Sequence, residues 1–356
     1  MAKRRGAIVG YGFIAERGHL PAYAGGDLEV VAVADICAER RRAAAAAIPG
    51  VRVYESHREL IAKEGAEIEF LDVCTPPYAH AEIAHAGLDA GLHVLCEKPL
   101  ATKIEDARSL LEHAARAKRV LFPSHNYKHA PVIKAVRQVI DAGLIGRIHQ
   151  VTLSTYRNTH ARGVKDWNES WRRERRYSGG GIAMDHGSHT FYLAFEWLRS
   201  YPTAITAKMS TQGGPGGGAD TEDTFSSTIT FPTGVATAHL TWTAGIRKQI
   251  YTVHGERGAI RVENDDVEVA IIGERAEGKS GGVTWELKNE KISSEWMDAS
   301  HVTWFVSLLR QFGKAIDDRT YVGRDAEDAL RSVELITTAY ASANDGCREL
   351  ELPRPV

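Results

Sequence analysis

Three polar residues in this sequence have side chains suited to moving a proton to and from an oxygen atom. Lys98 follows an apolar stretch expected to be a strand, 92–96, whereas Asp185 and His189 are four residues apart in an expected helix, 182–198. Residues four apart share one face of a helix, so we expect these two to be neighbours. An imidazole, with an ordinary pKa of about 6.5, can act as a general base, and a lysine can stabilise a developing oxyanion. Removal of a hydride from a secondary alcohol needs both functions.

Each of these three residues also has a purely structural interpretation. His189 shares its expected helix with several aromatic residues and could be a buried histidine, and Asp185 could be a charge favoured by the helix dipole. Lys98 could be an ordinary surface lysine. If the three act together, Asp185 would either fix the imidazole tautomer or hold the substrate. His186 invites a metal site with His189, but no further ligands follow at a suitable spacing, so we expect no metal.

The start of the chain contains a pattern that binds dinucleotides. An apolar stretch breaks at Gly10, Gly12 follows after one residue, and Ala15 is small enough for a helix to pack against the strand. In this G-x-G-x-x-(G/A) pattern, Gly10 makes a tight turn and Gly12 lets the backbone approach a pyrophosphate. The N–H groups that open the helix face the phosphates, so we expect Phe13 and Ile14 to join the glycines in binding the cofactor.

Asp35 indicates which dinucleotide is bound. It ends a second apolar stretch, 30–34, where a dinucleotide-binding unit keeps the carboxylate that binds the adenosine ribose hydroxyls. A carboxylate at this position repels a 2′-phosphate, so the sequence favours NAD over NADP. Arg40, Arg41 and Arg42 lie in the next expected helix and could soften this preference. The structural alternative is that Asp35 only caps that helix.

Strands and helices alternate along the first third of the chain. This alternation implies an α/β fold with a parallel doubly wound sheet, which binds ligands at the carboxyl ends of its strands. We assign residues 1–125 to this NAD-binding Rossmann domain. The further expected strands are 51–54, 68–74, 92–96 and 120–122, and the expected helices are 56–63, 78–90 and 104–117.

After residue 125 the pattern becomes rich in strands. Alternating or β-branched segments separated by turns predict a large, mostly antiparallel open sheet within an α+β domain, 126–356. Its last expected helix, at about 326–343, could pack back on the Rossmann domain. The roles of this domain in binding substrate and in forming an oligomer interface are implied by the family resemblance given below. A glycine-rich segment, 213–218, is expected to be a mobile loop. The expected strands are 148–156, 204–211, 224–230, 235–243, 249–254 and 259–262, and the other expected helices are 131–142, 182–198 and 302–316.

Composition excludes several classes of protein. The 356 residues carry a net charge of −2, which gives no general attraction to nucleic acid or anionic lipid. No apolar run approaches the roughly 20 residues that a membrane span needs, and no signal peptide precedes the first strand. Cys37, Cys74, Cys96 and Cys347 include no C-x-x-C pair. We therefore expect reduced thiols in a cytoplasmic protein, without a zinc or disulfide framework.

Three further motifs together resemble those of the Gfo/Idh/MocA family of NAD(P)-dependent oxidoreductases. They are Thr75-Pro76-Pro77 with His80, Glu97-Lys98-Pro99, and Gly179-Gly180-Gly181-Ile182-Ala183-Met184-Asp185-His186-Gly187-Ser188-His189. Each is modest alone, but their joint occurrence in the family's order is specific. Members such as glucose–fructose oxidoreductase and inositol 2-dehydrogenase pair a Rossmann domain with a C-terminal α/β domain, whose open sheet usually forms an oligomer interface. The resemblance implies a sugar or cyclitol substrate and a homo-oligomer, either a dimer or a tetramer.

The resemblance also implies roles for individual residues. It puts Lys98 beside the nicotinamide and the substrate hydroxyl, makes Asp185 and His189 its catalytic partners, and puts Glu97 near the nicotinamide ribose. The bond between Lys98 and the following proline is often cis in the family. Trp167 could stack on a sugar, or its tryptophan- and arginine-rich surroundings could be a solvated face. The expected cofactor contacts are Gly10, Gly12, Phe13, Ile14, Asp35, Thr75, Pro76, His80, Glu97 and Lys98, and the expected substrate contacts are Lys98, Asn126, Trp167, Arg172, Asp185 and His189.

We therefore expect an NAD-dependent oxidoreductase that transfers a hydride between the nicotinamide and a secondary hydroxyl of a sugar, sugar derivative or cyclitol. One alternative is an enzyme that retains NAD and uses transient oxidation for elimination, epimerisation or glycoside cleavage. Another is a non-catalytic sensor of NAD or sugar, although a sensor does not need Lys98, Asp185 and His189 together. His186 departs from the hydrophobic residue common in the family, which predicts an unusually polar or aromatic pocket.

Overall fold

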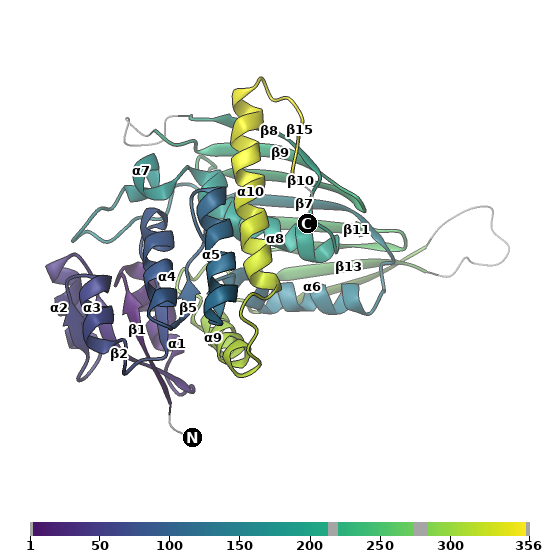
Figure 1. The fold of residues 1–356 in the computed structure, drawn as a ribbon. Helices are drawn as coiled ribbons and strands as arrows, with labels where there is room; N and C mark the ends of the chain where they lie inside the picture. Colours follow the sequence, from purple (N-terminus) through teal and green to yellow (C-terminus); the bar gives the residue numbers. More distant parts are fainter. Residues whose placement is uncertain (1–2, 213–219, 274–283, 354–356) are drawn as a thin grey trace.

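A computed structural model describes residues 3–212, 220–273 and 284–353. The chain forms two sheets that lie side by side, with most helices packed against them (Figure 1). The expected glycine loop at 213–218 lies outside the described residues. Within the described ranges, no helix combines the length and the apolar character needed to cross a lipid bilayer.

The first sheet has six parallel strands, and it confirms the predicted doubly wound topology. Its strand order is β3-β2-β1-β4-β5-β6, so the direction of winding reverses between β1 and β4, and ligands bind at such a switch point. The strands are β1 (Arg4–Val9), β2 (Leu28–Ala34), β3 (Arg52–Tyr54), β4 (Phe70–Val73), β5 (His93–Cys96) and β6 (Leu121–Pro123).

Helical segments connect the strands of this sheet. The first begins with a π turn, η1, rather than a regular α-helix, and the predicted helix at 78–90 begins with a 3₁₀ turn, η2. Ser56 caps the third helix by accepting the Glu59 N–H, and Lys118 ends the last one in a left-handed conformation. The segments are η1 (Ala15–His19), α1 (Leu20–Ala22), α2 (Ala38–Ala47), α3 (His57–Glu64), η2 (Pro77–Ala79), α4 (His80–Asp89) and α5 (Ile104–Ala117).

The second sheet has nine strands and is mostly antiparallel, as the sequence predicts. Its order is β14-β13-β12-β11-β7-β10-β9-β8-β15, and only β7 and β10 pair in parallel. The strands are β7 (Ile148–Tyr156), β8 (Ala204–Ser210), β9 (Thr224–Phe231), β10 (Gly234–Thr241), β11 (Lys248–Gly255), β12 (Gly258–Glu263), β13 (Asp266–Ile272), β14 (Trp285–Lys291) and β15 (Leu350–Glu351).

Three of these strands, β13, β14 and β15, are absent from the sequence-based prediction. Strand β13 alternates Val267, Val269 and Ile271 with more polar residues, so its signal was present and was overlooked. Strand β14 is exposed at all seven positions, with apolar residues only at Trp285 and Leu287, and β15 has only two residues. Both depend on pairing with a neighbouring strand, which local sequence does not report.

The helices of the second half connect the two sheets. Helix α10 packs against α5 of the first sheet as well as against α8 and β8, and α9 packs beside η1 and α1 (Figure 1). Phe305 and Phe312 of α9 share a buried cluster with Ile8 and Tyr11, near the start of the chain. The helical segments are η3 (Asn126–His129), α6 (Pro131–Asp141), η4 (Trp171–Arg173), α7 (Arg175–Ser178), α8 (Ile182–Trp197), α9 (Val302–Asp317) and α10 (Arg324–Asn344).

Candidate active site

The glycine-rich turn after β1 has the shape that a dinucleotide requires. Gly10 has a φ of +91°, and a Cβ atom there would lie 2.8 Å from the backbone nitrogen of Thr75. A Cβ atom at Gly12 would meet no atom within 4 Å, so its backbone borders open space. Ala15 is fully buried, and Phe13 is 44% exposed. This turn therefore fits a pyrophosphate at the opening of the first helical segment.

Asp35 lies directly after β2 and organises the backbone around the same turn. Its Oδ2 accepts the Tyr11 N–H at 2.7 Å, and its Oδ1 accepts the Cys37 N–H at 2.8 Å. Burial raises the pKa of Asp35, while these two N–H groups and the charges of nearby arginines oppose that rise. The structural alternative, in which Asp35 caps the next helix, is not seen: Cys37 holds the N-cap position of α2 without a side-chain cap, and Asp35 instead accepts the N–H groups of Cys37 and Tyr11.

Lys98 connects the two halves of the molecule. It follows β5, its peptide bond to Pro99 is cis, and its ammonium lies 2.7 Å from Oδ1 and 3.0 Å from the carbonyl oxygen of Asp185. Its side chain is 10% exposed and that of Asp185 is 14% exposed, so water does little to weaken this ion pair. The ion pair brings together two of the three predicted catalytic residues from opposite halves.

The position of Asp185 depends on how helix α8 begins. Glu222 precedes β9, and its carboxylate accepts the N–H groups of Gly181 and Ala183 and the hydroxyl of Tyr340. These bonds satisfy donors at the start of α8, where a negative charge also interacts favourably with the helix dipole. Sequence analysis missed Glu222, because a cap that comes from another element has no local signature.

The charges around Asp185 keep it ionised. Burial by itself raises the pKa of Asp185, but the charges of Lys98 and Arg172 hold it well below its ordinary value. Arg172 Nε lies 3.5 Å and His186 Nε2 lies 3.9 Å from Oδ2 of this carboxylate. Burial lowers the pKa of His186 to about 3, so this histidine is a neutral neighbour at pH 7.

His189 lies on the same helix but has a different set of neighbours. Its ring stacks on that of Tyr127 in η3, with centroids 4.1 Å apart, and its Nδ1 is buried without a hydrogen-bond partner. Burial lowers the pKa of His189 well below its ordinary value, so the ring is neutral and can accept a proton. Among the described residues, no hydrogen bond joins His189 to Asp185, which bonds Lys98 instead. Tyr127, the neighbour that orients the imidazole, was not singled out from the sequence.

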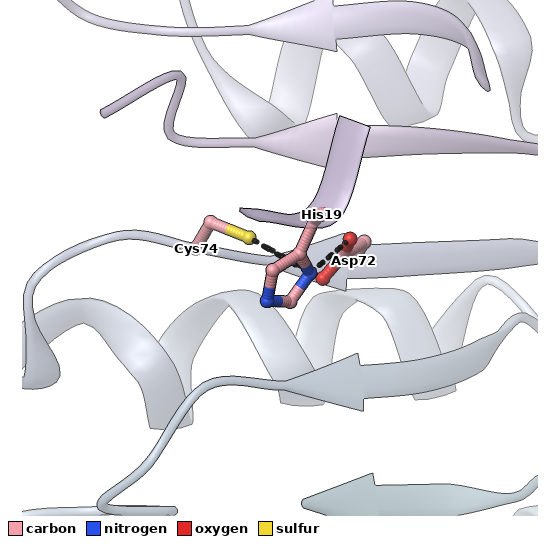
Figure 2. Close-up of side chains that lie close together, drawn as sticks. All are labelled: His19, Asp72 and Cys74. Atoms are coloured by element: carbon pink, nitrogen blue, oxygen red, sulfur yellow. Dashed lines mark hydrogen bonds and ion pairs between the residues drawn. The ribbon is translucent and has the colours of Figure 1, made fainter. Parts of the chain in front are cut away.

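A buried network includes Glu97, the residue before Lys98, and Figure 2 shows three other members of it, His19, Asp72 and Cys74. The two ring nitrogens of His19 bond Asp72 Oδ2 at 2.8 Å and Glu97 Oε1 at 3.0 Å. Asp72 also accepts the hydroxyl of Tyr23 at 2.8 Å and the thiol of Cys74 at 3.3 Å. Burial by itself lowers the pKa of His19, but Asp72 and Cys74 raise it well above its ordinary value. This rise in pKa favours the protonated form of His19, which lies between Asp72 and Glu97.

The same cluster has the composition of a metal site. His19, Asp72 and Cys74 offer three potential ligand atoms that lie within 4.8 Å of one another. Each side-chain donor in the cluster already has an acceptor, so hydrogen bonding accounts for its geometry. Sequence analysis missed this cluster, since its members come from η1, β4 and the segment that follows β4.

The remaining expected cofactor residues surround the same strand ends. The ring of buried His80 lies between the carbonyl oxygens of Thr75 and Pro99, 2.7 Å from each, and so joins the two loops that follow β4 and β5. Glu97 directs one oxygen to His19, and its other oxygen accepts the Lys98 N–H at 3.3 Å. Thr75 and the adjoining Pro76 are half-buried.

Of the other expected substrate residues, Arg172 lies at Asp185, Asn126 is buried, and Trp167 packs in a separate aromatic cluster. Asn126 is 4% exposed, and its Oδ1 has no hydrogen-bond partner, while Arg172 reaches Asp185 as described above. Trp167 instead packs edge-on against Tyr177, with ring centroids 5.3 Å apart, and Tyr177 packs against Tyr78 in the same way. Trp167 therefore belongs to an aromatic cluster that bridges the two halves, next to the start of α4.

Two family models match this chain. One, described as an oxidoreductase family with an NAD-binding Rossmann fold, covers residues 4–125, and the C-terminal alpha/beta domain of the same family covers residues 137–352. The 1,5-anhydro-D-fructose reductase of Ensifer adhaerens is 28% identical over 91% of both chains, and the inositol 2-dehydrogenase of Rhizobium meliloti is 30% identical over 89% of both. The levoglucosan dehydrogenase of Pseudarthrobacter phenanthrenivorans is 28% identical over 59% of this chain and 60% of its own length.

Solved structures with the same fold include NAD complexes. GenD2 from gentamicin A biosynthesis, in complex with NAD, has a TM-score of 0.81 at 25% identity and matches 99% of this chain and 97% of its own. Levoglucosan dehydrogenase with NADH and L-sorbose has a TM-score of 0.84 at 22% identity over 100% of both chains. With the two family models covering nearly the whole sequence, the chain belongs to the Gfo/Idh/MocA family of oxidoreductases and carries its NAD-binding Rossmann domain.

Proposed function

We propose that this enzyme transfers a hydride between NAD and a secondary hydroxyl of a sugar, sugar derivative or cyclitol, with Lys98, Asp185 and His189 as its catalytic residues. The observation that carries the proposal is the 2.7 Å contact between the Lys98 ammonium and Asp185, which joins the Rossmann half to α8. The named relatives, an anhydrofructose reductase and an inositol dehydrogenase, support the substrate class.

The three residues divide the work between them. NAD, when bound, supplies the group that accepts or donates the hydride. Lys98 donates to the substrate hydroxyl oxygen and stabilises the negative charge that develops there, while Asp185 holds the ammonium in place. His189, neutral because of burial, accepts the hydroxyl proton, and stacking on Tyr127 fixes the plane of its ring. In the opposite direction, protonated His189 returns that proton to a ketone oxygen.

We also propose that the enzyme prefers NAD to NADP. The three arginines that could bind a 2′-phosphate already have acidic partners: Arg40 bonds Glu16 at 2.6 Å, Arg41 bonds Glu55 at 2.9 Å, and Arg42 bonds Glu39 at 2.6 Å. Arg40 also donates to the Tyr11 carbonyl oxygen, and Arg41 to the Asp35 carbonyl oxygen. A 2′-phosphate would have to displace these contacts and would also meet the Asp35 carboxylate.

The division of the chain and its assembly are proposals as well. We propose that residues 1–125 bind NAD and that residues 126–356 bind substrate and form a homo-oligomer through the open face of the second sheet. Burial alternates along β9, so one face of that strand is packed and the other is partly accessible. The four cysteines are free thiols, which supports a cytoplasmic location. Light scattering on the purified protein measures the oligomeric state.

The experiment that tests the proposed function follows NADH absorbance at 340 nm with NAD and a set of sugars and inositols. We expect turnover with at least one polyol and none in Lys98→Ala, whose NAD binding, measured by fluorescence, remains largely intact. Normal turnover in Lys98→Ala, or loss of NAD binding with turnover retained, would contradict the catalytic assignment. Tight NAD that copurifies and is never released as NADH would instead favour an enzyme that retains its cofactor.

A further inference from the structure

Two arginines face each other at one end of the second sheet. Arg157 directly follows β7 and Arg247 directly precedes β11, and these strands pair antiparallel with Tyr156 opposite Lys248. Extending this register by one residue places Arg157 opposite Arg247. Like charges directly opposite each other on neighbouring strands destabilise a sheet. A negative charge placed between the two arginines would offset this repulsion.

Neither guanidinium has that compensation from the protein. Arg157 is 8% exposed, and its Nη1 is buried without a hydrogen-bond partner, as is Nε of Arg247. In the described parts of the chain, no carboxylate lies within ion-pair distance of either side chain. Burial, and then the charge of Arg157, lower the pKa of Arg247. Arg157 is buried and Arg247 is partly exposed. A buried cation without an ionic partner is costly, so Arg157, with Arg247 opposite it, suits a negative group that arrives from outside.

Nearby charged side chains do not fill this role. The charge of Asp298 acts to raise the pKa of both Arg247 and His301. Asp298 is exposed, however, and its two carboxylate oxygens already accept the N–H and the hydroxyl of Ser300. Two other arginines of the region have their own acids: Arg172 lies 3.5 Å from Asp185, and Arg173 lies 3.6 Å from Asp223. Arg157 and Arg247 therefore carry positive charge that no carboxylate of the described residues balances.

The arginine pair borders the candidate active site. Burial raises the pKa of Tyr127, and Arg157 opposes that rise through its charge and a side-chain hydrogen bond, so its guanidinium lies beside the tyrosine. The Tyr127 ring in turn stacks on His189 at 4.1 Å. The charges of Arg157 and Lys98 both help to lower the pKa of the buried His186 in the same site. Arg157 is therefore connected through Tyr127 to His189, one of the residues expected to meet the substrate hydroxyl.

We propose that Arg157 and Arg247 bind an anionic group carried by the substrate, so that the enzyme acts on a sugar or cyclitol bearing a carboxylate or a phosphate. This inference rests on the proposed function and narrows its substrate class. A guanidinium offers several donors in a fixed plane and binds either anion through two parallel hydrogen bonds. The pyrophosphate of the cofactor is not the anion that these two arginines bind, because its expected site is the glycine turn after β1, in the other half.

Paired substrates provide the first test. Turnover with NAD is compared between D-glucose, D-glucuronate, D-gluconate and D-glucose 6-phosphate, and between myo-inositol and its monophosphates. We expect kcat/KM to be higher for an anionic member than for its neutral partner, and the carboxylate and phosphate arms show which anion is preferred. Replacing Arg157 with Gln should lower the ratio of anionic to neutral kcat/KM roughly 30-fold or more, the loss typical of removing one member of a buried charge pair.

Matched variants separate charge recognition from general damage. Arg247→Gln should lower the same ratio, and Arg157→Lys should restore part of it, since the charge returns without the planar fork. Arg147→Gln is the control: Arg147 precedes the other end of β7, is exposed, and pairs with Glu256 at 2.9 Å. Its ratio should equal that of the wild type.

A second measurement does not require turnover. With saturating NAD present and ionic strength held constant with sodium chloride, sodium phosphate or sodium gluconate should raise the melting temperature of the wild type and of Arg147→Gln, but not that of Arg157→Gln. An equal or higher kcat/KM for neutral substrates, or an anion effect that persists in Arg157→Gln, would overturn the inference. If nothing is turned over but the anion effect depends on Arg157, the proposed function fails and the anion site stands.

Discussion

The His19 network makes a quantitative prediction about stability. Replacing His19 with glutamine removes the cation that lies between Asp72 and Glu97, at 2.8 Å and 3.0 Å from their oxygens. The side chains of His19 and Asp72 are fully buried and that of Glu97 is 11% exposed, so water cannot replace the lost partner. Breaking a buried ion pair from one side costs about 3–5 kcal/mol. That loss is a large part of the roughly 5–15 kcal/mol that stabilises an ordinary domain.

The assay is urea denaturation at pH 7, followed by circular dichroism, for the wild type, His19→Gln, Asp72→Asn and the double variant. Asp72→Asn removes one of the carboxylates that His19→Gln leaves unpaired. The double variant should therefore lose less than the sum of the single losses, by up to about 3 kcal/mol. His93→Gln is the control, since His93 accepts only the Val120 N–H, and its loss should be about 1 kcal/mol.

The pH dependence gives an independent check with a defined sign. The pKa of His19 is raised in the folded state, so its contribution is fully present below the unfolded pKa of about 6.5 and declines as pH rises toward the folded value. The difference between the wild type and His19→Gln should therefore be smaller at pH 9 than at pH 6. A loss no larger than that of His93→Gln, together with additive single losses, would refute the view of His19 as a buried imidazolium.

Three further predictions concern the cofactor, the base and the helix that carries it. Asp35→Ser should lower the ratio of kcat/KM for NAD to that for NADP, and an unchanged ratio would mean that the carboxylate serves only the Tyr11 and Cys37 N–H groups. Burial lowers the pKa of His189, so kcat/KM should stay high as pH falls through 6.5 and decline only at more acidic pH; a decline centred on 6.5 would indicate a solvated base. Glu222→Gln should lower the free energy of unfolding by about 1–3 kcal/mol, measured by denaturation, because N–H groups at the start of α8 lose a charged acceptor. Unchanged stability would mean that the N–H groups of α8 do not depend on that charge.

Much of the fold could be predicted, because local patterns carry it. The predicted bounds of α5 and β7 match the structure residue for residue. Buried residues recur with a helical period along α5, whereas β7 is marked by its β-branched and aromatic residues. Gly10, Asp35 and Lys98 were expected at one edge because all follow strands of a parallel sheet, and the structure brings them there. Strand β14 alternates apolar and polar residues only at its start, with Trp285 and Leu287, and it was missed.

Sequence by itself determined most of the elements and which polar residues follow them, since strand and helix periods, caps and turns depend on neighbours along the chain. Tertiary structure alone decided which side chains meet across long separations. Asp185 bonds Lys98 rather than the histidine one turn away, and His19 lies between two carboxylates more than 50 residues along the chain. Arg157 and Arg247 become neighbours only through the pairing of β7 with β11. Such contacts depend on strand order and helix packing, which no short stretch of sequence specifies.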